Sequence, residues 1–132
     1  MELTKINYPD LNPKQQESYN YHKVSALLAD YGYSGILLAD DYQGADFLAM
    51  HIDGTILKVQ LKSRITISKS YIGKEIHMAF PVRGQWCLIP HDVLLEIVSS
   101  WQETKVWETK GLYHAKNPNK ATVEALQDYL IS

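Results

Sequence analysis

Hydrophobic positions recur at the spacing of an α-helix near the start of the chain. They form one apolar stripe, which consists of Tyr21, Val24, Leu27, Leu28 and Tyr31. Asn12 stands before this stretch as a helix N-cap, followed by Pro13 and by Gln15, which completes a capping box. The pattern predicts a helix that runs to the last residue of the stripe and stops at Gly32, with residues 1–11 as an N-terminal arm.

The middle of the chain alternates apolar and polar residues, which is typical of strands. Strand-like runs cover residues 36–39, 46–52, 55–64, 76–80 and 86–89. An Asp-Gly pair at positions 53–54 is a hairpin signal between the second and third runs. An Arg-Gly pair at positions 83–84 joins the last two runs, so the sequence predicts two consecutive hairpins.

Two further helical patterns close the chain. The first covers residues 92–101, and the second opens at Asn119 and continues to residue 132. The buried side of the second pattern consists of Val123, Leu126 and Leu130. A helix, a series of strands and two more helices predict one α/β domain over residues 1–132, built on a mixed sheet of four or five strands with helices on both faces.

Two registers are open for the hairpin around the Asp-Gly pair. A two-residue loop would put Asp46 on the opposite face from Gln60 and Lys62. A three-residue loop over residues 52–54, with a left-handed glycine, places Asp46 opposite Gln60. The hydrophobic pattern favours this second register, because it leaves both faces of the hairpin largely apolar, as in a sheet that is covered on both sides.

In that register, Asp46, Gln60 and Lys62 gather at one end of an otherwise apolar face. Burying an acid, an amide and an amine is costly unless they share a ligand or pair with each other. Counting back along the helical stripe from Val24 through Tyr21 reaches Glu17, so a second carboxylate is expected near the same place. This grouping indicates a functional site, and the alternative is a structural ion pair between Asp46 and Lys62.

The order of Glu17 on a helix, Asp46 on a strand and Gln60-x-Lys62 across a hairpin resembles the PD-(D/E)XK nuclease superfamily. It is most similar to the D…QxK variants, which include small prokaryotic endonuclease-like proteins and a homing endonuclease with a PD-(D/Q)XK motif. The resemblance covers about residues 14–90. It implies a restriction-endonuclease-like core and a Mg²⁺-dependent deoxyribonuclease, an endonuclease that hydrolyses phosphodiester bonds in DNA.

By the same resemblance, Asp46 is the principal ligand of Mg²⁺ or Mn²⁺, and the Gln60 side-chain oxygen and the Leu61 carbonyl complete the protein's share of the ligands. Hard oxygen donors suit these cations. Glu17 is implied to hold a metal-bound water or a second ion. Lys62 is implied to orient or deprotonate the attacking water and to offset charge on the scissile phosphate.

The sequence departs from the family pattern in two places. Ala45 occupies the position of the proline in the motif, and Gln60 replaces an acid, which removes one negative charge from the metal site. A catalytically inactive nuclease-fold protein that binds nucleic acid or a protein partner is therefore an alternative. A second alternative is an interaction module of unrelated α/β fold, in which Glu17 should lie far from Asp46.

Charge along the chain narrows the surface on which DNA is expected to bind. The 132 residues carry a net charge of −2, but residues 51–86 hold six Lys or Arg against two acids. The basic residues proposed to contact DNA are Arg64, Lys69, Lys74 and Arg83. The alternative for each of them is a solvated basic side chain without a partner.

Several classes of protein are excluded or disfavoured by composition. Cys87 is the only cysteine, so an internal disulfide and a thiolate zinc cluster are excluded. The five histidines lack metal-ligand spacing and are predicted to be surface or capping residues. The N-terminus lacks the apolar run of a signal peptide, and the apolar stretches are too short for a membrane span, so we expect a cytoplasmic protein. Little chain lies outside the core, and a homodimer or higher homo-oligomer would bring two sites to two DNA strands.

Overall fold

Four α-helices and eight strands make up the computed structural model, which describes residues 1–115 and 117–132. The helices are α1 (Pro13–Ala29), α2 (His91–Ile97), α3 (Lys105–Lys110) and α4 (Lys120–Ala125). The strands are β1 (Tyr33–Tyr42), β2 (Ala45–His51), β3 (Ile56–Leu61), β4 (Ile65–Ser68), β5 (Ile76–Val82), β6 (Gln85–Pro90), β7 (Leu112–Ala115) and β8 (Leu130–Ile131). Short 3₁₀ turns are η1 (Tyr8–Asp10), η2 (Lys69–Tyr71), η3 (Ser99–Glu103) and η4 (Gln127–Tyr129). Within this described part, none of the helices is both long enough and apolar enough to cross a lipid bilayer.

Six of the strands form one mixed sheet in the order β1-β2-β3-β5-β6-β8. Strands β3 and β5 are parallel, and the other neighbours are antiparallel. Strands β4 and β7 form a separate antiparallel pair. The mixed α/β class predicted from the sequence is confirmed, but the sheet is larger than the four or five strands predicted. The additional edge strand β8 has only two residues, too few for an alternating pattern to be read.

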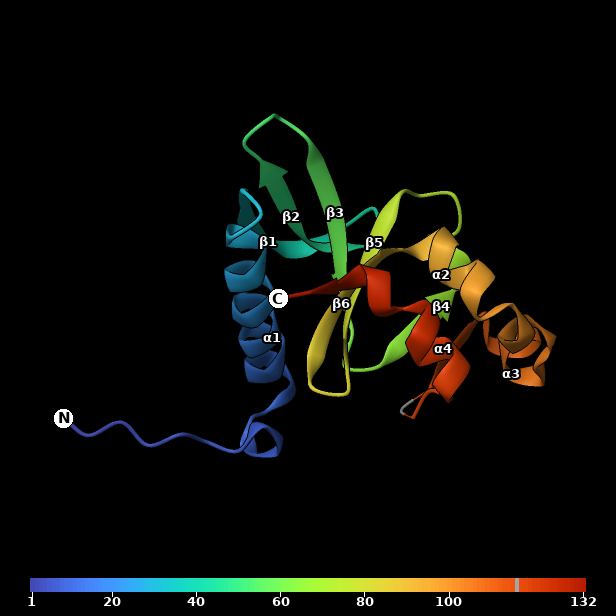
Figure 1. Ribbon diagram of the computed structural model, residues 1–132, viewed down its shortest axis with the longest axis horizontal. Coiled ribbons are helices and arrows are strands. Elements are labelled where there is room, and N and C mark those ends of the chain that lie inside the picture. Colours follow the sequence, from blue (N-terminus) through green and yellow to red (C-terminus); the bar gives the residue numbers. More distant parts are fainter. Residues whose placement is uncertain (116) are drawn as a thin grey trace.

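The sheet separates two apolar layers, with α1 on one side and α2, α3 and α4 on the other (Figure 1). Val24 and Leu28 of α1 pack against a buried cluster that includes Phe47 and Val59. The second layer gathers buried residues of β4, β5 and β6 with those of the later helices. Strand β5 supplies both layers, because alternate side chains along a strand point to opposite faces.

Helix α1 begins as the sequence predicts. The Asn12 side chain accepts the N–H of Gln15 at 2.8 Å, and the Gln15 side chain accepts the N–H of Asn12 at 3.0 Å. This capping box satisfies two backbone donors that would otherwise be unpaired at the helix start. The helix ends at Ala29, two residues earlier than predicted, and Tyr31 is exposed beyond it, where its hydroxyl donates to the Ser132 carbonyl at 3.2 Å.

The β2–β3 hairpin has the predicted three-residue loop. The N–H of His51 donates to the Thr55 carbonyl at 2.8 Å, and Gly54 has a φ of +95°, a left-handed conformation that glycine adopts readily. The pairing continues down the two strands to Phe47 opposite Val59, and the same register places Asp46 opposite Gln60. The register on which the site prediction depends is therefore confirmed.

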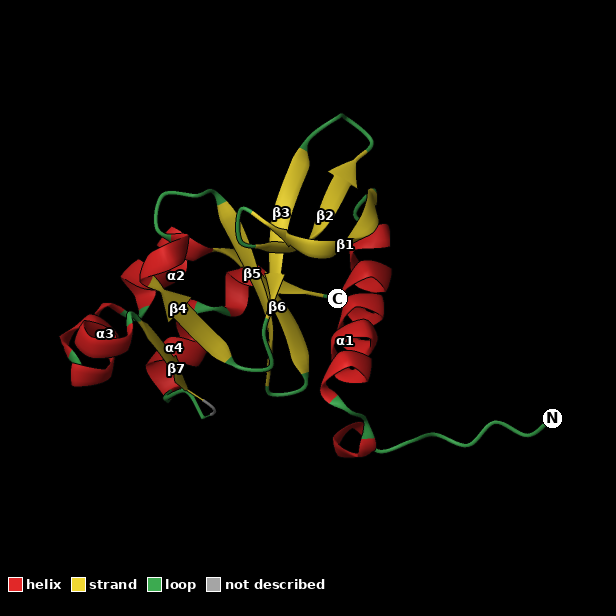
Figure 2. Cartoon of the chain, turned by 180° about the vertical axis from the view of Figure 1, so that it is seen from behind, coloured by secondary structure: helices red, strands yellow, loops and turns green. Residues whose placement is uncertain are grey.

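The second face of strands β1, β2 and β3 is open, contrary to the prediction of a sheet covered on both sides. Ile36 is 46% exposed and Ile56 is 56% exposed on this face. The later helices lie over the other half of the molecule, beside β4, β5 and β6 (Figure 2). Apolar alternation in a strand thus indicated its faces correctly without showing which of them is covered.

Three of the predicted elements after the first helix are broken or end early. The run 55–64 is broken after Leu61, and β4 begins at Ile65. The helix predicted over 92–101 ends at Ile97 and continues as η3. The helix predicted over 119–132 opens at Asn119, whose side chain accepts the N–H of Thr122 at 2.8 Å, but it ends at Ala125. Beyond it, Leu130 pairs with β6, because an open sheet edge offers the backbone hydrogen bonds that a frayed helix end lacks.

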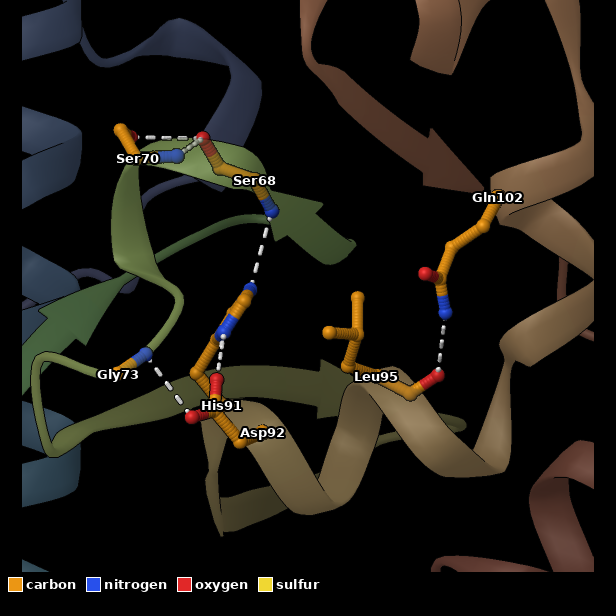
Figure 3. Close-up of polar contacts among 7 residues, drawn as sticks. All are labelled: Ser68, Ser70, Gly73, His91, Asp92, Leu95 and Gln102. Carbon is orange, nitrogen blue, oxygen red and sulfur yellow. Dashed lines mark hydrogen bonds and ion pairs between the residues drawn. The ribbon is translucent and has the colours of Figure 1, made fainter.

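A buried histidine ties α2 to the end of β4 (Figure 3). The ring of His91 is 1% exposed, and its Nε2 accepts the N–H of Ser68 at 3.0 Å. Nδ1 therefore carries the proton and donates to Asp92 Oδ1, also at 3.0 Å. Asp92 in turn accepts the N–H of Gly73 at 3.0 Å. The prediction of a surface or capping role was wrong for His91, because the ring is buried and its Nε2 is paired with Ser68, which is distant in sequence.

Candidate active site

The predicted site residues line one cleft of about 310 Å³, where the start of α1 meets the ends of β2 and β3. Its walls consist of Pro13, Gln16, Glu17, Asn20, Asp46, Gln60, Leu61, Lys62 and Ser63. The structure thus brings together Glu17, Asp46, Gln60 and Lys62, which come from three separate elements. The alternative of an unrelated fold required Glu17 to lie far from Asp46, and the shared cleft contradicts it.

Asp46 is half-buried at the start of β2 and is held by the neighbouring strand. Its Oδ2 accepts the backbone N–H of Leu61 at 2.8 Å. Burial raises the pKa of Asp46 above its usual value, and the negative charge of Glu17 raises it further, while the Leu61 N–H and the Lys62 charge act against them. The position therefore disfavours a charged carboxylate in the absence of a cation.

In the part of the chain that the structure describes, neither carboxylate of the cleft forms an ion pair with a side chain. Among residues 1–115 and 117–132, Asp46, Glu17 and Lys62 take part in no ion pair within 4.0 Å. A structural ion pair between Asp46 and Lys62, which the sequence left open, is therefore not formed. Two acids that share a cleft and repel each other constitute a place where a cation would be stabilised.

Gln60 and Leu61 supply neutral oxygen atoms at the end of β3. The Gln60 Nε2 lies 3.5 Å from the Leu61 carbonyl oxygen, a weak hydrogen bond at most. Because the two ends of an amide are nearly the same size, turning the Gln60 amide over would bring its oxygen to the side of the carbonyl. The pair can then present two oxygen atoms beside Asp46.

Lys62 follows β3 directly and is fixed by its backbone. Its N–H donates to the Ala79 carbonyl at 2.9 Å, which extends the parallel pairing between β3 and β5 by one residue. Lys62 lines the cleft and also a second cavity of about 360 Å³, which we name the basic cavity. The walls of the basic cavity consist of Lys62, Ser63, Arg64, Thr66, Ser68, Tyr71, Leu112 and His114.

Tyr71 and His114 are neighbours of the site that sequence reasoning missed. Burial raises the pKa of Tyr71, and the negative charges of Asp46 and Asp41 raise it further. Burial also lowers the pKa of His114, as do the positive charges of Arg64 and other basic residues. Both reach the basic cavity from η2 and β7, and no pattern along the chain connects those segments with the β2–β3 hairpin.

The four residues predicted to contact DNA do not line one common cavity. Arg64 lines the basic cavity next to the cleft. Lys69 lies with its Nζ 5.5 Å from the centroid of the Trp107 ring, and Lys74 lines a separate cavity. Arg83 is exposed in the turn between β5 and β6. Of these predictions, the one for Arg64 is best supported by position, and all four stay predictions.

The donor atoms of the cleft fit Mg²⁺ or Mn²⁺. These cations prefer hard oxygen ligands, and Mg²⁺ in particular is held by one or two carboxylates while it keeps several waters. The cleft offers the carboxylates of Asp46 and Glu17, the amide of Gln60 and the carbonyl of Leu61. In the described part of the chain, no three His, Cys, Asp or Glu residues gather as they would around a fully protein-bound ion such as structural zinc.

No protein-family model and no curated protein matches the chain. Its structure is similar to that of Hjc, a Holliday junction resolvase from the archaeal hyperthermophile Archaeoglobus fulgidus, with 17% identity over 57% of this chain and 72% of Hjc and a TM-score of 0.44. It is also similar to a bacterial homing endonuclease, with 14% identity over 83% of this chain and 78% of the endonuclease and a TM-score of 0.48. The names of both proteins identify them as nucleases, and the sequence motif of this chain resembles that of a nuclease superfamily. Since both TM-scores are below 0.5, we infer function from the side chains alone.

Proposed function

We propose that this protein is a metal-dependent endonuclease that hydrolyses phosphodiester bonds in DNA. The observation that carries the proposal is the state of Asp46, a half-buried acid with a raised pKa that shares a cleft with Glu17. In the described residues neither acid has a cationic partner within 4.0 Å. Such an arrangement costs stability in the isolated chain and is typical of a site built for a ligand.

Asp46, Glu17, Gln60 and the Leu61 carbonyl are the groups that would hold Mg²⁺ or Mn²⁺. When bound, such an ion activates water for attack and neutralises negative charge that develops on the phosphate. The Leu61 N–H has a supporting role, because it fixes one oxygen of Asp46 and so orients the carboxylate. Gln60 keeps the donor set at two negative charges rather than three, which is expected to make binding of the cation weaker than in sites with an additional acid.

Lys62 is the group that we expect to act on the substrate. Lys62 lines both the cleft and the basic cavity, so its amine is expected to donate to an oxygen of the scissile phosphate and to the attacking water. Arg64 in the basic cavity would bind the adjacent phosphate of the same strand. The two basic residues would therefore position the backbone across the acidic pair.

The proposal is tested by incubating plasmid, single-stranded and branched DNA with Mn²⁺ and each of three proteins. The wild type is expected to cleave at least one substrate, and Lys62→Ala is expected to be about 100-fold slower or worse, since it removes a charge from the transition state. Lys58→Ala is the matched control, because Lys58 is a lysine of β3, the strand that Lys62 directly follows, and its Nζ donates to the Gln43 side chain at 3.1 Å. Cleavage by Lys62→Ala at the rate of Lys58→Ala would contradict the assigned role.

One observation favours a second candidate, a nuclease-fold protein that binds DNA without cleaving it. In this structure it is the Gln60 nitrogen that faces the Leu61 carbonyl, and Gln60 stands where the related motif has an acid. The two candidates are separated by Gln60→Glu. If the wild type binds DNA and never cleaves it, while Gln60→Glu cleaves with Mn²⁺, the protein is the inactive form.

A further inference from the structure

A third cavity, which we name the aromatic cavity, shares a wall with the cleft. It measures about 260 Å³, and its walls consist of Tyr8, Tyr19, Asn20, Ser63, Pro81 and Trp86. Asn20 and Ser63 line the cleft as well. The three rings come from η1, α1 and β6, so segments distant in the sequence meet beside the candidate active site (Figure 1).

The rings of the aromatic cavity are held in place by their own contacts. Asn20 donates from Nδ2 to the Tyr8 hydroxyl at 2.8 Å, and the Tyr8 and Tyr19 rings meet edge to face with centroids 5.3 Å apart. Gln16 donates to the Leu11 carbonyl at 3.2 Å and fixes the chain between η1 and α1. Trp86 is anchored from behind, since it packs against the buried layer under α1. The cavity is therefore formed before any ligand arrives.

The chemical character of the lining residues differs among the cleft, the basic cavity and the aromatic cavity. Ser63 lines all three cavities, which places the aromatic cavity, the acidic cleft and the basic cavity around one residue. Lys23 adds a positive charge on the aromatic side, with its Nζ 5.3 Å from the centroid of the Tyr19 ring. A ligand that fits the whole surface must combine anionic groups with a flat apolar group at the spacing of neighbouring cavities. A nucleic-acid strand with one unstacked base has that chemistry.

We propose that the aromatic cavity binds one unpaired nucleobase of the DNA strand whose phosphate lies in the cleft. The assignment of that phosphate rests on the proposed function, whereas the base site rests on the rings. A base inside a continuous duplex is stacked on both sides and could reach the rings only by leaving the helix, at a cost that an unpaired base does not carry. The substrate class inferred is therefore DNA with an unpaired nucleotide next to the cleaved bond.

The base site is tested by binding without divalent metal, so that no cleavage occurs. Fluorescence anisotropy is measured with a fully paired duplex and with the same duplex carrying one unpaired 2-aminopurine nucleotide. The wild type is expected to bind the second at least about fivefold tighter and to quench the 2-aminopurine fluorescence by stacking. Tyr19→Ala is expected to remove both effects while it binds the paired duplex within about twofold of the wild type.

Two further variants keep the result interpretable. Tyr19 is 36% exposed, so its removal should leave the fold intact, and Tyr19→Leu, which keeps apolar volume without a flat ring, is expected to behave like Tyr19→Ala. Tyr31→Ala, at the other end of α1, is the control and should retain the wild-type preference. Equal binding of the two duplexes by the wild type, or a preference that survives in both Tyr19 variants, would overturn the proposal.

The base site and the proposed function fail in different experiments. A wild type that prefers the unpaired nucleotide and cleaves no DNA with Mn²⁺ would overturn the nuclease function and support the base site. A wild type that cleaves DNA and does not distinguish the two duplexes would overturn the base site and leave the nuclease function standing.

Discussion

Burial of the Asp46 carboxylate lowers the stability of the folded protein, and the same carboxylate is a candidate ligand for a cation. This carboxylate is half-buried and lies near the charge of Glu17, and its single hydrogen bond in the described part of the chain comes from the Leu61 N–H. Burial is the main reason for its raised pKa. An acid placed in this way destabilises the metal-free protein whenever it is ionised, and this has consequences that can be measured without any substrate.

Replacing the carboxylate by an amide should stabilise the metal-free protein. Asp46→Asn keeps an oxygen for the Leu61 N–H and removes the buried charge, so we expect the melting temperature at pH 7 to rise by about 2–4 °C. The gain should disappear as the pH falls through the raised pKa of Asp46 toward its usual value of 3.8, because the wild-type carboxyl is then neutral as well. Calorimetry between pH 3 and pH 8 measures it, and a variant less stable than the wild type at pH 7 would contradict the account.

The neighbours of Asp46 should move its pKa in opposite directions. Glu17→Gln removes a negative charge and should lower the pKa of Asp46, whereas Lys62→Ala removes a positive charge and should raise it. The measurement is a titration of the Asp46 carboxyl carbon by NMR in metal-free buffer. Shifts of the same sign in the two variants would show that the three side chains do not share one electrostatic environment.

At the scale of elements, the sequence correctly predicted the features that depend on neighbouring residues. The capping box at Asn12 and the left-handed glycine at position 54 were both read from the sequence, because each depends on residues within three positions. The hairpin then fixed Asp46 opposite Gln60 and, with it, most of the candidate site.

The parts that could not be predicted depend on pairing across the chain. The β4–β7 pair and the edge strand β8 form because distant backbones meet, and their short runs show no distinctive alternation. Tyr71 reaches the site region from η2, which directly follows β4. These strands therefore form through hydrogen bonds between distant segments, and hydrophobic periodicity alone could not predict them.

The start of α1 should couple helix stability to the site. Asn12→Ala removes the N-cap and is expected to cost about 1 kcal/mol of unfolding free energy. Because Glu17 lies in the first turns of the same helix, Mn²⁺ affinity should fall severalfold as these turns fray. Asn119→Ala is the matched control, since Asn119 caps α4 in the same way away from the cleft. Urea denaturation should show similar losses for the two variants, while calorimetry should show weaker Mn²⁺ binding only for Asn12→Ala.

At the scale of the whole molecule, charge is distributed unevenly over a chain whose net charge is only −2. Lys62 and Arg64 line the basic cavity beside the acidic pair of the cleft. A single cleft of this kind addresses one strand at a time. Under the proposed function, cleavage of two strands in one binding event would need two copies of the chain, and a homo-oligomer would supply them.

The homodimer or higher oligomer stays a prediction with a direct test. Light scattering of the metal-free protein at micromolar concentration should give a mass of at least 30.2 kDa, twice the 15.1 kDa of one chain. A mass of 15.1 kDa under the same conditions would show a monomer, and cleavage of both strands would then require two separate binding events.

The central claim is that the cleft of Asp46, Glu17, Gln60 and the Leu61 carbonyl binds a divalent cation, and calorimetric titration with Mn²⁺ tests it most directly. We expect one site per chain in the wild type and an affinity at least about tenfold lower in Asp46→Asn, whose fold and stability should be retained. Equal binding of Mn²⁺ by the two proteins, or no binding by the wild type, would contradict the claim.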